Sequence, residues 1–452
     1  MVHKNQVIPL LIESISSDGN GVGHHEGFAV FVPGAAKGDV LRVRIVKRTK
    51  SYSYGRIEQI VTPGRGRQKP DCPISSICGG CDFRHITYKA ELEAKKNFVQ
   101  SAIQRIGGLD VDVPPVLPSP SLHRYRNKAQ YPVAPDKNKG LSYGFYANRS
   151  HRIIPCEDCL LQPEFMNQIA SRIVELFIQM GISGYDEITQ SGLIRHIYMR
   201  QSVRLGEVLL CIVATSENLP NKQELISTLI GEFPDIKSIV LNVNQRSTNV
   251  ILGQKNCVLY GNSTIKDDLC GVPLLLGPFS FSQVNTYGAE RLFGLAKEYA
   301  SLQKGETLLD LYCGTGVIGL SMAEDAGRLI GVEITPEAVE GARRSAAEMG
   351  LSNTLFMCED AGTASSRLAA EGIHPDVIIV DPPRKGCDSA TIKAVLSMNP
   401  SRIVMISCNA ATMARDLAVL VDGGYHVQNL QPVDLFPRTK HVESVVLMLR
   451  NS

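Results

Sequence analysis

The sequence predicts a multidomain chain built from three parts: a small β-barrel, a central α+β domain, and an α/β domain with a mostly parallel, Rossmann-like sheet. Three observations predict this order. Short apolar runs separated by glycine turns fill residues 1–63, strand-like runs mixed with helical stretches fill residues 70–275, and strand and helix patterns alternate over residues 280–452. The length of 452 residues also suits two to four domains at about 150 residues each.

The composition is that of a soluble globular protein, with 44% hydrophobic and 20% charged residues. No apolar run reaches the roughly 18 residues of a membrane span, and no signal-peptide core follows the N-terminus. We therefore expect a cytoplasmic protein without membrane contact, and no obligate protein partner is evident. In that compartment the twelve cysteines are not expected to form disulfides, and some of them are expected to bind metal or react.

The first part reads as short strands joined by glycine turns. Strand-like runs lie at residues 8–15, 28–32, 40–45 and 56–61, with a turn over residues 18–23. Short strands packed this closely predict a small barrel of the oligonucleotide-binding kind. This stretch resembles a TRAM domain, an RNA-binding barrel appended to RNA-modifying enzymes.

Basic residues cluster although the net charge is only +2. Around Tyr52 and Tyr54, opposed only by Asp39 and Glu58, lie Lys37, Arg42, Arg44, Lys47, Arg48, Lys50, Arg56, Arg65, Arg67 and Lys69. A second stretch carries Arg124, Arg126, Lys128, Lys137, Lys139, Arg149 and Arg152. Clustered cations with aromatic rings favour contact with a nucleic acid, and a merely solvated face is the alternative.

The central part opens with a cysteine-rich segment. Cys72, Cys78 and Cys81 lie among glycines, and Cys156 and Cys159 follow in a second short segment. Close thiols in a cytoplasmic protein indicate a soft metal centre, with structural zinc as the alternative. Spacing alone does not choose between the two later cysteines as fourth ligand.

Helical patterns are expected at residues 88–106, 164–180 and 223–233, and strands at 194–199 and 208–213. The helix at 88–106 is a candidate to pack on the C-terminal domain rather than on the central one.

The C-terminal part begins with a cofactor motif. A strand at 307–311 runs into a glycine turn and a helix, and the next strand ends in Glu333, an acid suited to hold ribose hydroxyls. Gly314, Gly316 and Gly319 formally match the dinucleotide fingerprint, so an NAD enzyme is one alternative. Asp310 before the turn and the Asp381-Pro382-Pro383-Arg384 strand end favour S-adenosylmethionine instead, and this combination resembles class I methyltransferases acting on nucleic acid.

Two residues near the C-terminus carry nucleophile and base chemistry. Cys408 follows an apolar strand-like run, and Glu443 precedes another. A thiol and a carboxylate at neighbouring strand ends suit covalent attack followed by proton removal. Because the thiolate is the reactive form, we expect this site to favour deprotonation of the cysteine. A cysteine that merely packs is the alternative for Cys408 taken alone.

Together these motifs resemble the RNA 5-methyluridine (uracil-5-) methyltransferase family, in its branch that bears a TRAM barrel and an iron–sulfur cluster. The resemblance implies Cys408 as the nucleophile that adds to uracil C6 and Glu443 as the base that removes the C5 proton. It implies S-adenosylmethionine as the cofactor, held by Gln283, Tyr312, Glu333 and Asp381, with Asp360 near the adenine. It also implies a [4Fe–4S] cluster on Cys72, Cys78, Cys81 and Cys159, since the distal ligand precedes a hydrophobic-Pro segment.

The same resemblance implies ribosomal RNA, of the large subunit (23S), as the substrate. A transfer RNA T-loop uridine methyltransferase is the first alternative. An amino-methylating enzyme and a non-catalytic RNA-binding or assembly protein are the others; the former uses an aromatic residue after the paired prolines, where this chain has Arg384.

Overall fold

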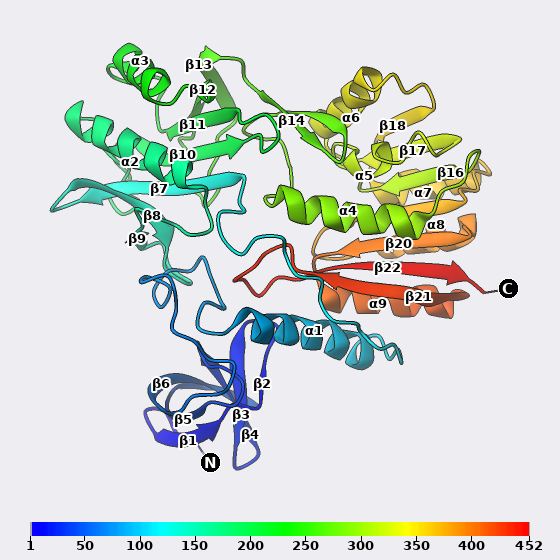
Figure 1. Cartoon of the computed structure of the whole chain (residues 1–452), viewed down its shortest axis with the longest axis horizontal. Coiled ribbons are helices and arrows are strands. Elements are labelled where there is room, and N and C mark those ends of the chain that lie inside the picture. The colour runs from blue at the N-terminus through cyan, green and yellow to red at the C-terminus, as the bar shows by residue number, and fades with distance from the viewer. Residues whose placement is uncertain (1, 452) are drawn as a thin grey trace.

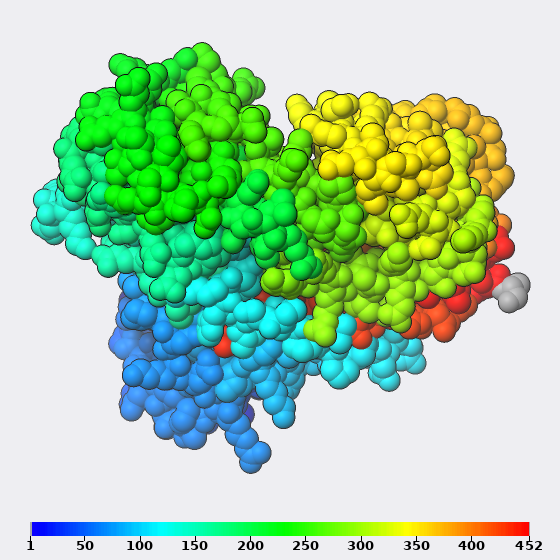
Figure 2. Space-filling view, turned by 45° about the horizontal axis from the view of Figure 1, so that its top comes forward, coloured from blue at the N-terminus to red at the C-terminus, as the bar shows by residue number. Residues whose placement is uncertain are grey.

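The computed structural model describes residues 2–451 and contains three large sheets joined by long connecting segments (Figure 1). The N-terminal barrel lies below the cysteine segment, and the central and C-terminal sheets lie side by side above it. A notch separates the central lobe from the outermost C-terminal helices (Figure 2). Within residues 2–451 no helix is long and apolar enough to cross a membrane.

The barrel is a six-stranded sheet in the order β1-β5-β6-β4-β3-β2. Its strands are β1 (Val7–Leu11), β2 (Ser14–Ile15), β3 (Asn20–His25), β4 (Phe28–Pro33), β5 (Val40–Arg48) and β6 (Tyr52–Thr62). The run at residues 8–15 is divided into two strands, and the predicted turn at 18–23 is largely the strand β3. Gly23 shows why this strand was missed: a Cβ there would lie 2.1 Å from the Leu11 carbonyl oxygen, so the crossing strands require glycine.

The central sheet has seven strands in the order β13-β12-β11-β10-β7-β8-β9. They are β7 (Lys128–Asp136), β8 (Gly140–Tyr146), β9 (Ile153–Pro155), β10 (Ile194–Gln201), β11 (Val208–Ala214), β12 (Ile236–Val243) and β13 (Lys255–Gly261). Helices α2 (Glu164–Gln179) and α3 (Lys222–Glu232) share one apolar core with one face of the sheet. The opposite face shares its core with the C-terminal domain and with a hairpin of β14 (Ile265–Leu269) and β15 (Val272–Leu276).

The C-terminal sheet has the order β18-β17-β16-β19-β20-β22-β21. Its strands are β16 (Thr307–Leu311), β17 (Arg328–Glu333), β18 (Thr354–Cys358), β19 (Val377–Val380), β20 (Arg402–Ser407), β21 (Tyr425–Val433) and β22 (Glu443–Arg450). Strands β16 to β20 are parallel, as predicted, whereas β22 inserts antiparallel between β20 and β21. Strand β22 runs toward the outer edge of the molecule (Figure 1). Because the parallel strands run in the opposite direction to β22, their carboxyl ends lie on the side of the central sheet and the cysteine segment.

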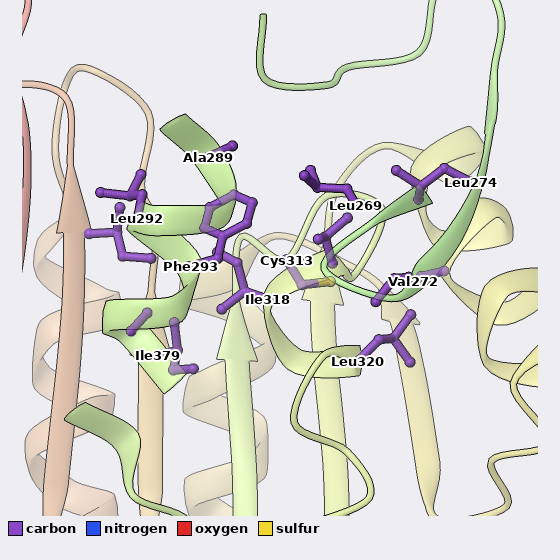
Figure 3. Packing of buried hydrophobic residues seen from close by; sticks show 14 of the residues in the cluster. Leu269, Val272, Leu274, Ala289, Leu292, Phe293, Cys313, Ile318, Leu320 and Ile379 are labelled. Atoms are coloured by element: carbon purple, nitrogen blue, oxygen red, sulfur yellow. The ribbon is translucent and has the colours of Figure 1, made fainter. Parts of the chain in front are cut away.

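Helices cover both faces of this sheet. They are α4 (Thr286–Ala300), α5 (Val317–Leu320), α6 (Pro336–Glu348), α7 (Ala361–Ala370), α8 (Ser389–Met398) and α9 (Ala410–Asp422). On one face Leu292 and Phe293 of α4 pack near Ile318 and Ile379, with the β14–β15 hairpin beside them (Figure 3). Thr335 precedes α6, and its side chain makes no capping hydrogen bond.

Helix α1 (Tyr88–Arg105) belongs to the core of the C-terminal domain, although it lies far upstream in the chain. Its apolar residues Val99, Ala102 and Ile103 are buried in the core on the α8 and α9 face of the sheet. At Gly107, just beyond the helix, a Cβ would lie 3.0 Å from the carbonyl oxygen of Ala414 in α9, so the two segments pack backbone to backbone.

Candidate active site

The glycine turn after β16 is held in backbone conformations that favour glycine. Gly314 and Gly316 have φ values of +55° and +78°, and Tyr312 before them has +63°. Behind the turn, Asp310 Oδ2 accepts a hydrogen bond from the Gly319 N–H (3.0 Å), while its Oδ1 has no partner. Burial raises the pKa of Asp310 to about 7. The turn thus has the strand–glycine turn–helix form that a cofactor site requires, with Asp310 fixed behind it.

Glu333 ends β17 beside this turn. Its carboxylate accepts hydrogen bonds from the Gly314 N–H (3.1 Å) and the Thr335 N–H (2.8 Å), which fix it at the mouth of the site. A fixed carboxylate at the tip of the second strand is suited to hold ribose hydroxyls.

The remaining predicted cofactor residues are held by different contacts. The Tyr312 hydroxyl lies 3.2 Å from Thr391 Oγ1, and burial raises the pKa of this phenol. Asp360 is exposed and caps α7 by accepting from the Thr363 N–H (3.1 Å). Gln283 is anchored through its backbone, because its carbonyl accepts from Asn127 Nδ2 (2.9 Å).

Cys408 and Glu443 come together at the edge between β20 and β22. Ser407, the last residue of β20, is paired with Ser444, so the residue after Ser407 lies beside the residue before Ser444. Cys408 is partly exposed and Glu443 is buried. Asp381 follows the neighbouring strand β19, and its charge acts on both groups. The sheet therefore brings a thiol and two carboxyls to one strand end.

The electrostatics of this edge differ from our expectation for the cysteine. Burial, followed by the negative charge of Glu443, raises the pKa of Cys408. The expectation that the free site favours the thiolate is therefore wrong, because burial and the carboxyl neighbour outweigh the opposing effects of Arg384 and of a backbone hydrogen bond on the pKa of this thiol. Burial also raises the pKa of Asp381 to about 7 and that of Glu443 to about 8.

These carboxyl shifts predict a pH-dependent stability. A carboxyl whose pKa is raised on folding stabilises the fold when protonated, and this contribution is lost between its ordinary value, 4.5 for Glu443, and about 8. The Glu443→Gln variant should therefore gain stability relative to wild type as pH rises, by roughly 3–4 kcal/mol more at pH 8.5 than at pH 5. Thermal unfolding across this pH range measures it.

The matched control is Glu340→Gln, which neutralises an exposed acid on α6 in the same domain. This control should show the pH dependence of wild type. Parallel curves for wild type and Glu443→Gln would show that Glu443 does not titrate with a raised pKa.

The segment at residues 434–442, which leads into Glu443, is held by the cysteine segment. The N–H groups of Asp82 and Phe83 donate to the Arg438 carbonyl (2.9 and 3.1 Å), and Asp82 Oδ2 accepts from the Lys440 N–H (3.0 Å). Since Asp82 directly follows Cys81, the cysteine segment and the segment before Glu443 are joined through backbone hydrogen bonds.

Buried ion pairs on α1 hold the same segment. Lys95 Nζ contacts Glu91 Oε1 (2.8 Å) and Asp434 Oδ1 (2.7 Å), and all three side chains are fully buried. Glu91 Oε1 also accepts from the Arg438 N–H (2.7 Å). Removing one partner of such a buried network typically costs about 3–5 kcal/mol. Helix α1 therefore fixes the position from which β22 starts, and with it Glu443.

Five cysteines of the central part line one cavity of about 80 Å³, together with Arg84 and Arg126. They are Cys72, Cys78, Cys81, Cys156 and Cys159. Cys81 Sγ accepts from Arg84 Nε (3.3 Å), and the buried Arg126 Nε has no hydrogen-bond partner. A hydrogen bond from Cys156, followed by backbone N–H groups of Leu161 and Gln162, lowers the pKa of Cys159.

A soft, anionic metal centre fits this donor set, because thiols converge on a cavity that two guanidinium groups border. Within residues 2–451, however, the structure contains no group of three or more Cys, His, Asp or Glu side chains placed so that it could hold a metal ion. The thiols therefore share a cavity without forming a finished coordination site.

Sequence patterns missed some residues of the site. Arg384 was noted only as the residue after two prolines, yet its positive charge acts on Cys408 and Glu443. Its guanidinium donates to His441 Nδ1 (3.2 Å). Burial lowers the pKa of His441 to about 4, so this imidazole is neutral. The signal for Arg384 was its place in the sequence, because it closes the Asp381-Pro382-Pro383-Arg384 segment that follows β19.

Comparison with known proteins identifies the family. Residues 277–451 match the family model described as tRNA (Uracil-5-)-methyltransferase, and residues 2–57 match the TRAM domain. An uncharacterized RNA methyltransferase of Halalkalibacterium halodurans is 42% identical over 452 residues, covering 100% of this chain and 98% of that protein. The chain belongs to the RNA uracil-5-methyltransferase family. Other members of similar length include an uncharacterized RNA methyltransferase of Clostridium tetani, which is 40% identical over 99% of this chain and 97% of its own length.

The solved structure of the tRNA (uracil-54, C5)-methyltransferase of Pyrococcus abyssi, in complex with S-adenosyl-L-homocysteine, superposes with a TM-score of 0.78 at 26% identity. The match covers 98% of this chain and 100% of that one. This RNA uracil-5-methyltransferase family member is thus an S-adenosylmethionine-dependent RNA methyltransferase with an N-terminal TRAM domain. The NAD, amino-methylating and non-catalytic alternatives are excluded by the family.

Proposed function

We propose that this enzyme forms 5-methyluridine in RNA, with Cys408 as nucleophile and Glu443 as base. The observation that carries the proposal is the pairing of Ser407 with Ser444, which puts the thiol and the carboxyl side by side where β20 ends and β22 begins. C5 of uracil is too weak a nucleophile to accept a methyl group unaided. Addition of the Cys408 thiolate to C6 converts the ring to an enolate, and C5 then becomes nucleophilic.

Bound S-adenosylmethionine supplies the electrophilic methyl group. Gln283, Tyr312, Glu333 and Asp381 are proposed to hold it, and Asp360 is proposed to lie near its adenine. After methylation, Glu443 takes the C5 proton, the C5–C6 double bond forms again, and the Cys408 sulfur leaves C6 as thiolate.

The pKa shifts of the free site support this order of events. Cys408 has a raised pKa, so its proton must leave when the uracil binds. Arg384 is the nearby cation that stabilises a thiolate, and an ionised Asp381 or Glu443 is available to take the proton. Glu443, with a pKa of about 8, is a sufficiently strong base to abstract the C5 proton once it is ionised.

For the substrate we propose large-subunit (23S) ribosomal RNA first, because the TRAM-bearing, cysteine-rich organisation resembles the branch of the family that acts there. Transfer RNA is the second candidate, since the P. abyssi neighbour acts on uracil-54 of tRNA. The deciding experiment maps 5-methyluridine by mass spectrometry in ribosomal and transfer RNA from a deletion strain and from its complemented control. Loss of the mark from a 23S fragment supports the first candidate, loss from tRNA the second, and loss from neither refutes both.

We also propose a [4Fe–4S] cluster on Cys72, Cys78, Cys81 and Cys159. With four thiolate ligands it would have no open position for substrate and would tie the cysteine segment to the segment around Cys159. The convergence of these thiols with Arg84 and the unpartnered Arg126 Nε supports an anionic occupant.

The cluster predicts different outcomes for two neighbouring thiols. Protein purified without oxygen should be brown and contain iron and sulfide. Cys159→Ser should lose most of its iron, whereas Cys156→Ser, the matched control on the same cavity wall, should keep it. Colourless, fully active protein with one equivalent of zinc would contradict the cluster and make the site a structural zinc centre.

A further inference from the structure

Two basic side chains meet on the face of the central sheet that points toward the C-terminal domain. Lys128 and Arg200 are direct partners in the antiparallel pair of β7 and β10, so their side chains project from the same face. Tyr198, which lies two residues before Arg200 and so shares that face, belongs to the core formed with the C-terminal domain. Like charges directly opposite each other destabilise a sheet, so this pairing calls for compensation.

No acidic side chain in the described part of the chain compensates them. Arg200 is buried, and its guanidinium donates to the Ser280 carbonyl and the Tyr198 hydroxyl, both neutral. Lys128 is half-buried, and within residues 2–451 its ammonium has no hydrogen-bond or ion-pair partner. Burial, followed by the charges of Arg200 and Arg126, lowers the pKa of Lys128 to about 8. Buried charges in proteins are normally paired, and here the missing partner is an anion.

This basic pair is tied to the candidate active site. The Arg200 guanidinium donates to the Ser280 carbonyl. A few residues on, Asn127 Nδ2 donates to the Gln283 carbonyl (2.9 Å). Asn285 Nδ2 then donates to the Leu435 carbonyl (2.9 Å), which lies in the segment leading to Glu443. On either side of Ser280 the chain exposes two rings: Phe279 is 54% exposed and Phe281 72%. Exposed aromatic rings beside cations are typical of sites that bind single-stranded nucleic acid.

We propose that Lys128 and Arg200 bind a backbone phosphate of the RNA strand next to the target uridine. The inference rests on the RNA substrate of the proposed function and adds a binding site outside the residues of methyl transfer. Arg200 supplies a fixed guanidinium, Lys128 supplies the charge that is free to pair, and the rings of Phe279 and Phe281 offer a stacking surface for the adjoining bases.

The test measures the affinity of the full-length protein for a short uridine-containing RNA at several KCl concentrations. Lys128→Gln should weaken binding at low salt and make the slope of log K against log salt shallower by about 0.7–0.9, the contribution of one phosphate contact. Lys128→Arg should keep the wild-type slope. Lys255→Gln is the matched control, since it removes the same charge from an exposed position on β13 at the opposite part of the same sheet.

Two further measurements separate the possible failures. Affinity for S-adenosyl-L-homocysteine should be unchanged by Lys128→Gln; a loss there with an unchanged RNA slope would assign the pair to the cofactor carboxylate and overturn the proposal. An equal slope for wild type, Lys128→Gln and Lys255→Gln would also overturn it. Formation of 5-methyluridine by the wild-type protein is assayed separately, so a failure of the proposed function is recognised independently of the salt slopes.

Discussion

Cys408→Ala should abolish methylation of RNA while leaving cofactor binding nearly intact. The thiol lies at the end of β20, and in the proposed mechanism it acts only on the base. Without addition to C6, C5 does not become nucleophilic, and we expect the rate to fall by at least about a thousandfold, the scale on which a lost nucleophile is felt. Transfer of labelled methyl groups to RNA measures the loss, and calorimetry with S-adenosyl-L-homocysteine measures cofactor affinity.

Cys387→Ala is the matched control for this variant. Cys387 is a buried thiol of the same domain, beside α8, and no role in catalysis is proposed for it. It should retain methylation, with at most the loss of stability expected of a small cavity. Measurable turnover by Cys408→Ala would refute the assignment of the nucleophile.

Glu443→Gln should give a different result: a stable covalent complex between protein and RNA. The variant retains Cys408, so the thiol can still add to C6, and C5 can still be methylated. Because the amide cannot accept the C5 proton, the methylated adduct cannot collapse, and it should accumulate as a slowly migrating band on a denaturing gel. Labelling from the cofactor should co-migrate with this band.

The double variant Cys408→Ala, Glu443→Gln is its control and should form no adduct. If Glu443→Gln gives no adduct but Asp381→Asn does, Asp381 is the base, since it is the other carboxyl at this edge. If neither single variant gives an adduct, the assignment of a carboxylate base at this strand edge is wrong.

Local patterns predicted much of this fold because its elements are locally encoded. The period of apolar residues predicted α1 over residues 88–106, and the structure has it at Tyr88–Arg105. The partners of that helix could not be predicted, since they depend on contacts such as that between Lys95 and Asp434, which are 339 positions apart in the chain. The insertion of β22 between β20 and β21 is likewise a non-local choice.

In the candidate site, too, local features were predicted and non-local ones were not. Cys408 and Glu443 were predicted at neighbouring strand ends because polar residues directly flank apolar runs there. The state of the thiol was predicted wrongly, because its pKa depends on burial and on the charges of Glu443 and Arg384, which come from other strands and loops. Lys128 was noted only as part of a basic stretch and Arg200 was not noted, since their pairing is set by the register of β7 and β10.

The hydrogen bonds and ion pairs that hold residues 434–442 also set the order in which the parts of the site can assemble during synthesis. The barrel, the cysteine segment and the central sheet all lie upstream of residue 277 and leave the ribosome well before the C-terminal sheet is complete. At about 5–20 residues per second, Asp82, Glu91 and Lys95 wait many seconds for the strand that follows Arg438. Until then the buried charges of α1 lack Asp434, and Glu443 has no fixed position. The contacts that hold Glu443 can therefore form only after the C-terminal sheet has been synthesised, and a fragment limited to residues 277–451 would lack the supports that put Glu443 in place.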